Sequence, residues 1–176
     1  MRARTIEIRR ARREDASALL NIYRDVVEST AVSFELIVPS EEQFAARIED
    51  ALRHWQWLVA TDGTKCIGYA YGSSHRKRGG YRWSTEVSAY VRQDCHREGI
   101  GRTLYTQLFE DLAELGYCNA YAGVTLPNPA SVAFHESLGF QAVGVFSRVG
   151  RKFGKWHDVA WFQRVLRDEP AEEPES

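Results

Sequence analysis

The stretch His96-Arg97-Glu98-Gly99-Ile100-Gly101 decides the fold, because it joins a strand-like run to the most regular amphipathic helix in the chain. The run before it covers residues 83–91, and the helix after it carries leucines at positions 104, 108, 112 and 115. Two glycines at this junction let backbone N–H groups turn towards a ligand, and the positive end of the helix favours a phosphate group there. The stretch lacks the lysine of a P-loop and the third glycine of a dinucleotide fingerprint, so neither of those sites is predicted.

The composition is that of an ordinary globular protein. The chain has 176 residues, of which 44% are hydrophobic and 27% charged, and 23 Lys and Arg nearly balance 24 Asp and Glu. Such a charge balance predicts no broad attraction to nucleic acid or to a membrane surface, and no apolar run approaches the roughly 20 residues of a membrane span. We expect one domain over residues 1–167, a disordered acidic tail over 168–176, and a cytoplasmic location, which three widely spaced cysteines also fit.

The remaining elements follow from hydrophobic periodicity on either side of this junction. Alternating or apolar runs bounded by turn residues predict strands at 6–10, 57–61, 66–73, 83–91, 119–124, 141–149 and 157–165. Apolar residues at helical spacing predict helices after Asp15, after Ser40 with Gln43 as a capping box, after Gly101, and over 129–138. Together these strands and helices follow one another in the order βααβββαβαββ.

A second motif, Phe134-His135-Glu136-Ser137-Leu138-Gly139-Phe140, makes the chain resemble the GCN5-related N-acetyltransferases (GNAT family). Residues 96–101 resemble the family's pyrophosphate loop, and residues 134–140 its Leu-Tyr-Glu-Lys-Leu-Gly-Phe motif. Segments 29–35, 86–91, 126–128 and 154–159 are most similar to the phosphinothricin and methionine sulfoximine N-acetyltransferases. The resemblance implies an α/β (α+β) fold with a mixed, mostly antiparallel twisted sheet of about seven strands and about four flanking helices.

The resemblance implies acetyl-coenzyme A as the cosubstrate and no metal. The residues implied to bind it are Ala89, Tyr90 and Val91 on the strand beside the pantetheine arm, Arg97, Glu98, Gly99, Ile100, Gly101 and Arg102 around the pyrophosphate, and Asn128. His96 stands where the family prefers Arg or Gln, which leaves open whether its side chain contacts phosphate.

The reaction implied by the resemblance is direct transfer of acetyl to the α-amine of a small amino-acid-like substrate. Glu86 matches the family's general base, which must remove a proton because a substrate ammonium titrates near 10, about where lysine does. His135 stands where many relatives hold a tyrosine acid, and it would protonate the leaving thiolate, orient the substrate or serve the helix alone. A backbone N–H near Tyr90 would stabilise the oxyanion.

A carboxylate-bearing substrate calls for arginine, whose planar guanidinium binds carboxylates through two hydrogen bonds. Residues 76–78 match the positions that hold the substrate in the resembled sub-family. The full predicted substrate set is Phe34, Arg76, Lys77, Arg78, Tyr81, Arg82, Trp83, Glu86, Val87 and Ser88.

Other functions remain open from the sequence. The same fold would serve a different amine, such as a peptide N-terminus or a polyamine. A nucleic-acid module based on Arg76, Lys77 and Arg78 is disfavoured by the net charge, and a zinc enzyme by the missing second histidine after His135. Relatives in the family are commonly homodimers, so we expect a homodimer, with Trp156, Trp161 and Phe162 serving either its interface or the core.

Overall fold

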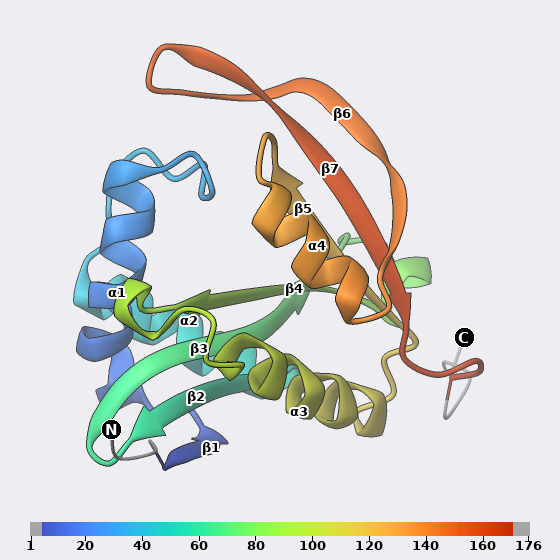
Figure 1. Cartoon of the computed structure of the whole chain (residues 1–176). Helices are drawn as coiled ribbons and strands as arrows, with labels where there is room; N and C mark the ends of the chain where they lie inside the picture. Colours follow the sequence, from blue (N-terminus) through green and yellow to red (C-terminus); the bar gives the residue numbers. More distant parts are fainter. Residues whose placement is uncertain (1–4, 171–176) are drawn as a thin grey trace. The chain divides into compact units, whose positions relative to one another are not determined.

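The computed structural model describes residues 5–170, so residues 1–4 and the end of the predicted tail, 171–176, lie outside the described residues. Within them, helices and strands follow one another in the predicted order (Figure 1). The helices are α1 (Ala16–Ser29), α2 (Glu41–His54), α3 (Ile100–Glu114) and α4 (Pro129–Ser137). The strands are β1 (Ile6–Arg10), β2 (Trp57–Asp62), β3 (Lys65–Ser74), β4 (Ser84–Val91), β5 (Asn119–Thr125), β6 (Gln141–Lys152) and β7 (Lys155–Val165).

The strands form one seven-stranded sheet in the order β1-β2-β3-β4-β5-β7-β6. β4 pairs with β5 in parallel, whereas β1 with β2, β2 with β3, β5 with β7 and β6 with β7 are antiparallel pairs. The predicted mixed, mostly antiparallel sheet with four helices is therefore confirmed. The β5-β7-β6 order means that the last two strands of the chain swap places relative to their sequence order.

The chain divides into two compact units. The first contains Met1–Arg24, Pro39–Ser73 and Val87–Leu115, and the second contains Asp25–Val38, Ser74–Glu86 and Gly116–Ser176. β4 contributes residues 84–86 to the second unit and residues 87–91 to the first. That residues 1–167 form a single domain stays a prediction.

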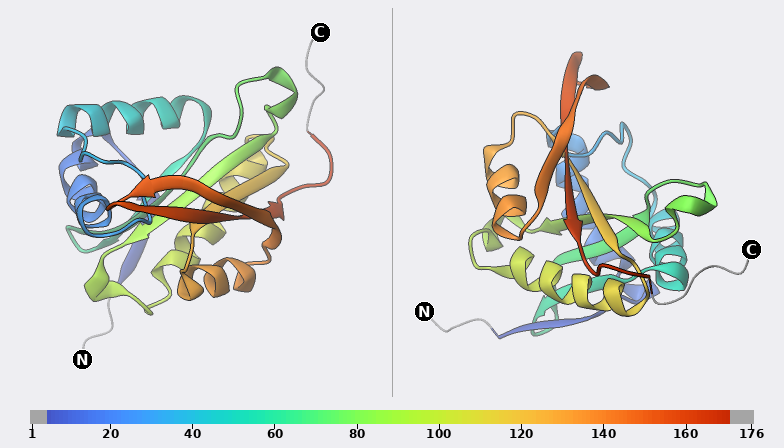
Figure 2. Two further views of the ribbon diagram at one scale, coloured as in Figure 1. Left: turned by 90° about the horizontal axis from the view of Figure 1, so that it is seen from above. Right: turned by 90° about the vertical axis from the view of Figure 1, so that its right-hand side faces the viewer.

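In the first unit, α2 and α3 lie on opposite sides of β2 and β3, and both contact β2 (Figure 2). The leucines at 104, 108 and 112 of α3 are fully buried, as their spacing predicts. Leu115, expected to extend this stripe, is instead the C-cap residue and is largely exposed. α2 begins with the predicted capping box, since the Ser40 hydroxyl accepts from the Gln43 backbone N–H and the Gln43 side chain accepts from the Ser40 N–H.

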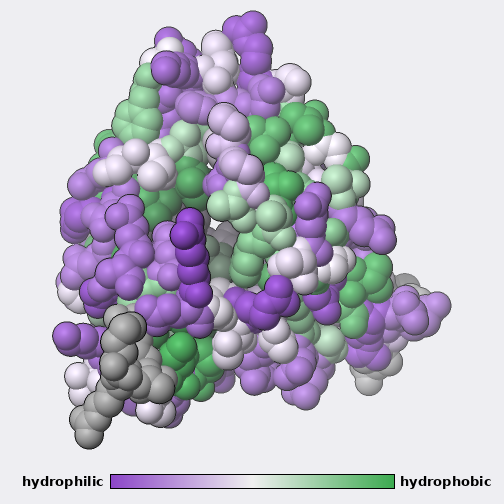
Figure 3. Space-filling view, viewed as in Figure 1, coloured by the Kyte–Doolittle hydropathy of each residue, from purple (hydrophilic) through white to green (hydrophobic). Residues whose placement is uncertain are grey.

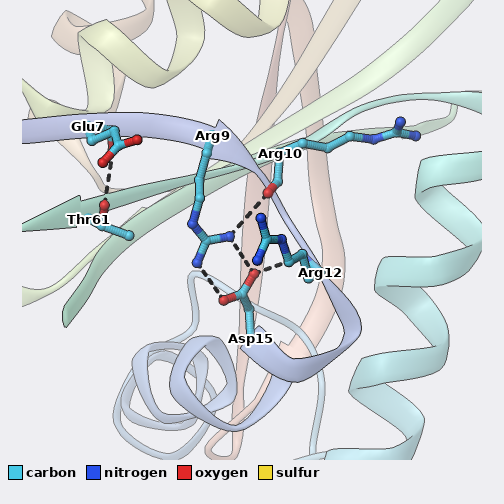
Figure 4. Close-up of polar contacts among 6 residues, drawn as sticks. All are labelled: Glu7, Arg9, Arg10, Arg12, Asp15 and Thr61. Atoms are coloured by element: carbon cyan, nitrogen blue, oxygen red, sulfur yellow. Dashed lines mark hydrogen bonds and ion pairs between the residues drawn. The ribbon is translucent and has the colours of Figure 1, made fainter. Parts of the chain in front are cut away.

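The arginines near the N-terminus have structural partners in the first unit (Figure 4). Arg9 donates two hydrogen bonds to the Asp15 carboxylate, at 2.7 and 2.8 Å, and the Arg12 backbone N–H donates a third at 2.8 Å. Arg13 forms ion pairs with Glu42 and Glu49 of α2. These contacts fasten β1 and the turn before α1, which agrees with the absence of these arginines from the predicted site.

In the second unit, β6 and β7 form a long two-stranded ribbon beside β5 (Figures 1 and 2). The predicted ends of these strands were wrong, since β6 runs three residues past 149 and β7 begins two residues before 157. Only Phe153 and Gly154 connect them, with φ of 50° and 73°. Two successive positive φ values are typical of a type I′ hairpin turn. Such a turn is usually recognised in a sequence by Asn, Asp or Gly in its first position, and here that position is occupied by phenylalanine.

Hydrophobic side chains are unevenly placed along β6 and β7. Phe162 is buried, whereas Trp156 is 51% exposed, so of the aromatic residues proposed for core or interface, Phe162 belongs to the core. Val143, Val145, Phe146 and Val149 of β6 are each at least half exposed. Figure 3 shows hydrophobic residues among hydrophilic ones over the region where Figure 1 places β6. Among the described residues, no helix has the length and apolar character needed to cross a membrane.

Candidate active site

β4 carries a large share of the predicted site. Side chains alternate along a strand, so Glu86, Ser88 and Tyr90 share one face while the residues between them share the other. Val87, which was predicted to bind the substrate, is 4% exposed. Its side chain packs in the core. Ser88 and Ala89 are partly exposed.

In the first unit, the ring of Tyr90 belongs to an aromatic cluster. Its centroid lies 5.2 Å from that of Tyr23 in an edge contact and 5.3 Å from that of Tyr69. β3 comes close to the same residue at Gly68, where an added Cβ would lie 3.1 Å from the Tyr90 carbonyl oxygen and 3.2 and 3.3 Å from methyl groups of Val91 and Ile100. The glycine thus lets β3 approach Tyr90 and Val91 of β4 and Ile100 of α3, three of the residues predicted to bind the cosubstrate.

The loop before α3 has the geometry of an anion site. Arg97 and Gly99 adopt left-handed φ values of 65° and 79°, and a non-glycine residue in this region marks a strained, often ligand-binding turn. Gly99 is the N-cap of α3 and supplies no side-chain cap, and the first turn contains no acidic residue. The N-terminal N–H groups and the helix dipole there suit a phosphate group. These residues fit the pyrophosphate of a coenzyme A ester.

His96 is engaged with the backbone of this loop. Its Nε2 lies 2.9 Å from the carbonyl oxygen of Val91, and since a carbonyl only accepts, Nε2 carries the proton and donates it. The contact ties the loop back to the end of β4. This nitrogen is therefore occupied by the protein rather than directed to a phosphate.

The first unit also contains a cavity of about 250 Å³ that the sequence did not predict. Aromatic side chains dominate its wall, including Phe44, Trp57, Tyr69 and Tyr71, with Arg47 and Asp50 contributed by α2. The rings of Trp57 and Tyr71 stack with centroids 4.2 Å apart. None of the predicted site residues lines this cavity.

In the second unit, Glu86 is held by a residue that sequence analysis missed. His75, which directly follows β3, places Nδ1 3.1 Å from Oε1 of Glu86. The imidazole stacks on the ring of Tyr121 with centroids 4.4 Å apart and an interplanar angle of 11°, and Tyr121 is the β5 partner of Glu86 in the sheet. The side chain of Glu86 is 34% exposed, so solvent reaches the carboxylate. The side chain of His75 is 14% exposed, so the imidazole is largely shielded from solvent.

The environment of Glu86 alters its acidity. Burial raises the pKa of this carboxyl above its usual value, and the hydrogen bond and charge of His75, together with the charge of Arg76, only partly oppose the rise. A carboxylate with a raised pKa is a better proton acceptor than a free glutamate. Glu86 thus has the properties that a general base requires.

The loop between β3 and β4 presents its cations to solvent. Arg76, Lys77, Arg78 and Arg82 are exposed, and so is Tyr81. Arg76 is close enough to Glu86 for its charge to act on the carboxyl, and the guanidinium of Arg82 lies 4.6 Å over the ring of Trp83. The structure therefore places Arg76 with Glu86, while Arg82 is engaged with its neighbour.

Phe34 is positioned by the β6–β7 ribbon of the second unit. Its ring fills the space in which a Cβ on Gly150 would lie, and its centroid is 6.1 Å from that of His157. The buried ammonium of Lys152 donates to the carbonyl oxygens of Val27 and Ser33, at 2.6 and 2.7 Å, and so fixes the segment that carries Phe34.

The two predicted residues of the α4 region have local roles in the second unit. Asn128 caps α4 through Oδ1, which accepts from the Ser131 N–H at 3.1 Å. His135 is buried, packs against Phe140 and Phe162, and donates from Nδ1 to the Ser131 carbonyl oxygen at 2.8 Å. Burial lowers the pKa of His135, so the imidazole is neutral near pH 7. Within residues 5–170, no group of His, Cys, Asp and Glu has the arrangement of a metal site.

The place of His75 in the chain is the one signal from which its role could have been inferred. It is the first residue of a connection between strands that neighbour each other in the sheet, so it returns to the start of β4. A single histidine gives no periodic pattern of its own, so the sequence did not mark His75 as part of the site.

Comparison with known proteins gives the class to which this fold and these residues belong. A family model described as "Acetyltransferase (GNAT) domain" matches residues 8–161. The chain belongs to the GNAT acetyltransferase family and is an acyltransferase.

Its relatives are acetyltransferases of similar length. It is 34% identical over 161 residues to a phosphinothricin N-acetyltransferase of Streptomyces viridochromogenes, covering 92% of this chain and 88% of that protein. It is 31% identical over 165 residues to an L-methionine sulfoximine/L-methionine sulfone acetyltransferase of Salmonella typhimurium, covering 93% of this chain and 96% of the relative.

Solved structures agree with this assignment. A phosphinothricin acetyltransferase from Sinorhizobium meliloti in complex with acetyl-CoA superposes with a TM-score of 0.90 at 32% identity, over 97% of this chain and 94% of that one. A ribosomal-protein-alanine N-acetyltransferase from Brucella melitensis gives a TM-score of 0.88 at 36% identity, over 90% and 99% of the two chains.

Proposed function

We propose that this protein transfers the acetyl group of acetyl-CoA to the α-amine of a small amino-acid-like substrate of the phosphinothricin, methionine sulfoximine or methionine sulfone type. The observation that carries the chemistry is Glu86, a partly buried carboxylate whose pKa is raised above its usual value. The names of the relatives supply the substrate class and the cosubstrate.

Acetyl-CoA supplies an activated thioester, and the residues of the chain bind it, position the acceptor and move the proton. The loop and first turn of α3, over residues 97–102, bind the pyrophosphate through backbone N–H groups. The backbone of Ala89, Tyr90 and Val91 positions the pantetheine arm, and Asn128 contributes its amide N–H₂, since its Oδ1 already caps α4. Positioning of this kind removes much of the entropic barrier to the reaction.

Glu86 takes the proton that the substrate ammonium must lose before its nitrogen attacks the thioester carbonyl. A backbone N–H near Tyr90 stabilises the negative charge that develops on the carbonyl oxygen. Arg76, with Lys77, Arg78 and Arg82 in the same loop, binds the substrate carboxylate, while Phe34, Tyr81 and Trp83 supply its apolar walls. His135 enters as an orienting residue, because a neutral imidazole that donates from Nδ1 to Ser131 has no proton to give at Nε2.

A second acceptor has one specific observation in its favour. The Brucella melitensis structure is that of an enzyme named a ribosomal-protein-alanine N-acetyltransferase, and its identity to this chain is 36%. This identity is no lower than that of the amino-acid acetyltransferases above. A peptide acceptor therefore belongs in every assay of substrate choice.

The testing experiment measures thiol release from acetyl-CoA with phosphinothricin, methionine sulfoximine, methionine sulfone, spermidine and a peptide with N-terminal alanine. We expect selective turnover of the first three. Turnover of the peptide alone would replace the proposed substrate class with the second one.

The role of Glu86 is tested on the preferred acceptor. Glu86→Gln should lower kcat by about 100-fold or more, because the base is lost, while binding of acetyl-CoA stays unchanged. The matched control is Glu7→Gln, which alters an exposed glutamate of β1 and should leave kcat unaffected. Unchanged turnover of Glu86→Gln would remove this residue from the chemistry.

A further inference from the structure

We propose that His75 is the positioning residue for Glu86: it holds Oε1 of the carboxylate through a hydrogen bond from Nδ1 and so keeps this base ionised and aimed at the acceptor amine. The inference rests on the proposed function of Glu86 as the base. It adds a residue that neither the sequence motifs nor the names of the relatives indicate.

The hydrogen bond has a defined direction. An ionised carboxylate only accepts, so the 3.1 Å contact requires the proton of His75 to lie on Nδ1. With Oε1 occupied by this donor, the remaining oxygen, Oε2, is the one that accepts the proton of a substrate ammonium. A single orientation of the carboxylate favours catalysis, because proton transfer depends on the distance and alignment of the base and the ammonium group.

The imidazole is itself held in place. It lies flat on Tyr121, whose position is fixed by the parallel pairing of β5 with β4 and the antiparallel pairing of β5 with β7. Tyr81 and Trp161 approach its edge, with centroids 6.0 and 6.3 Å away. Side chains from the loop, β5 and β7 therefore restrict the ring to an orientation in which Nδ1 faces Glu86.

The charges around the pair favour an ionised Glu86. Tyr81 and Tyr121 lie against the imidazole of His75, and the charge of Arg76 acts on Glu86. None of these neighbours is a carboxylate. Burial pushes the carboxyl towards its neutral form, while His75 and Arg76 push it back. Without His75, the effect of burial on the pKa of Glu86 is opposed by fewer favourable contacts. The pKa of Glu86 then rises, and the carboxyl is neutral over a wider pH range.

The test compares pH profiles of kcat/KM for the wild type, His75→Phe and His75→Asn. Phenylalanine keeps a flat ring on Tyr121 but has no donor, whereas asparagine keeps a donor near the position of Nδ1. For His75→Phe we expect the acid limb to move to higher pH, with kcat/KM reduced about tenfold on the acid side, as the loss of one hydrogen bond to a charged group implies, and near-normal values on the alkaline side. His75→Asn should restore most of the wild-type profile.

Two controls separate positioning from a general structural effect. His54→Phe changes an exposed histidine at the end of α2 and should leave the profile unaltered. In a Glu86→Gln background, His75→Phe should have no further effect, because the proposed action passes through Glu86. A uniform loss at all pH values, an unshifted acid limb, or additive effects in the double variant would overturn the proposal. If His75→Phe fails to fold by circular dichroism, His75→Leu serves as the donor-free variant.

A substrate-free measurement separates this inference from the proposed function. The carboxyl carbon of Glu86, followed by NMR in ¹³C-glutamate-labelled protein, should titrate at a higher pH in His75→Phe than in the wild type. An equal titration midpoint would overturn the role of His75 even if the enzyme acetylates amino acids. A shifted midpoint in a protein that acetylates none of the tested amines would retain the pair and reject the substrate assignment.

Discussion

Several charged side chains in this protein are largely withdrawn from water and are stabilised by specific partners. Lys152 is 4% exposed, and its ammonium donates to two backbone carbonyl oxygens, those of Val27 and Ser33. Burial lowers the pKa of Lys152, although the charge of Glu35 opposes this change. Asp15 is similar in kind, since a bidentate arginine and a backbone N–H surround a carboxylate whose side chain is 11% exposed.

Asp15 allows a prediction about acid stability. Burial alone would raise the pKa of its carboxyl, but hydrogen bonds from Arg9 and from the Arg12 backbone outweigh burial and hold the pKa below its ordinary value. A depressed folded-state pKa stabilises the protein above the unfolded pKa, and this contribution is lost as pH falls through the folded pKa. Asp15→Asn should therefore destabilise the protein by about 1–3 kcal/mol near pH 7, and by less near pH 3.

Urea unfolding at both pH values checks this expectation. The control is Asp25→Asn, which alters an exposed aspartate of α1 and should have little effect at either pH. A difference between Asp15→Asn and wild type that is as large near pH 3 as near pH 7 would show that the carboxylate charge is not what stabilises this turn.

At the scale of elements, the β6–β7 ribbon is shaped by local departures from regular pairing. The register shifts between Phe146 and Gly150, where Arg148 adopts a φ of 50°. The backbone N–H that this bulge releases is not lost, because Arg148 donates it to Oδ1 of Asp158 at 2.7 Å. Beyond the bulge, Gly150 leaves room for the ring of Phe34.

Gly150→Ala should displace Phe34 from the ribbon. The new Cβ would occupy the space of the ring, so we expect a loss of about 1–3 kcal/mol in the free energy of unfolding. If Phe34 is a wall of the acceptor pocket, KM for the acceptor should also rise. Gly144→Ala on the same strand is the matched control, because its Cβ would meet no atom within 4 Å. Equal stability and KM in the two variants would contradict this role of Gly150.

At the scale of the whole molecule, each compact unit carries its own group of the proposed residues. The first carries the loop and helix N-terminus proposed for the pyrophosphate, and the second carries Glu86, His75 and the basic loop. The net charge of −1 offers no general attraction for the anionic acetyl-CoA, so its binding depends on this local cradle. Homodimerisation and a cytoplasmic location stay predictions.

Acetyl-CoA should raise the melting temperature of the protein. A concentration of about 100 times Kd contributes about 2.7 kcal/mol, which corresponds to roughly 5–10 °C for a chain of this size. S-acetylpantetheine, which lacks the pyrophosphate, should give a much smaller shift at the same concentration, and added NaCl should reduce the shift caused by acetyl-CoA. Equal shifts with the two compounds would contradict a pyrophosphate site at the N-terminus of α3.

The sequence by itself determined the order of helices and strands, the mixed sheet, the family, and the presence of a carboxylate at position 86 on the strand that precedes the glycine-rich loop. The order of elements is encoded locally, since the period of apolar residues and the capping and turn residues report on a few neighbours along the chain. The mixed sheet, the family and the place of Glu86 follow from the resemblance of residues 96–101 and 134–140 to the motifs of the GNAT family. The tertiary structure decided the β5-β7-β6 strand order, the burial of Lys152, the contact of Phe34 with Gly150, and the hydrogen bond of His75 to Glu86. Each of these joins residues through the packing of separate elements, and the partner of a side chain across such a contact leaves no period or spacing in the sequence that could predict it.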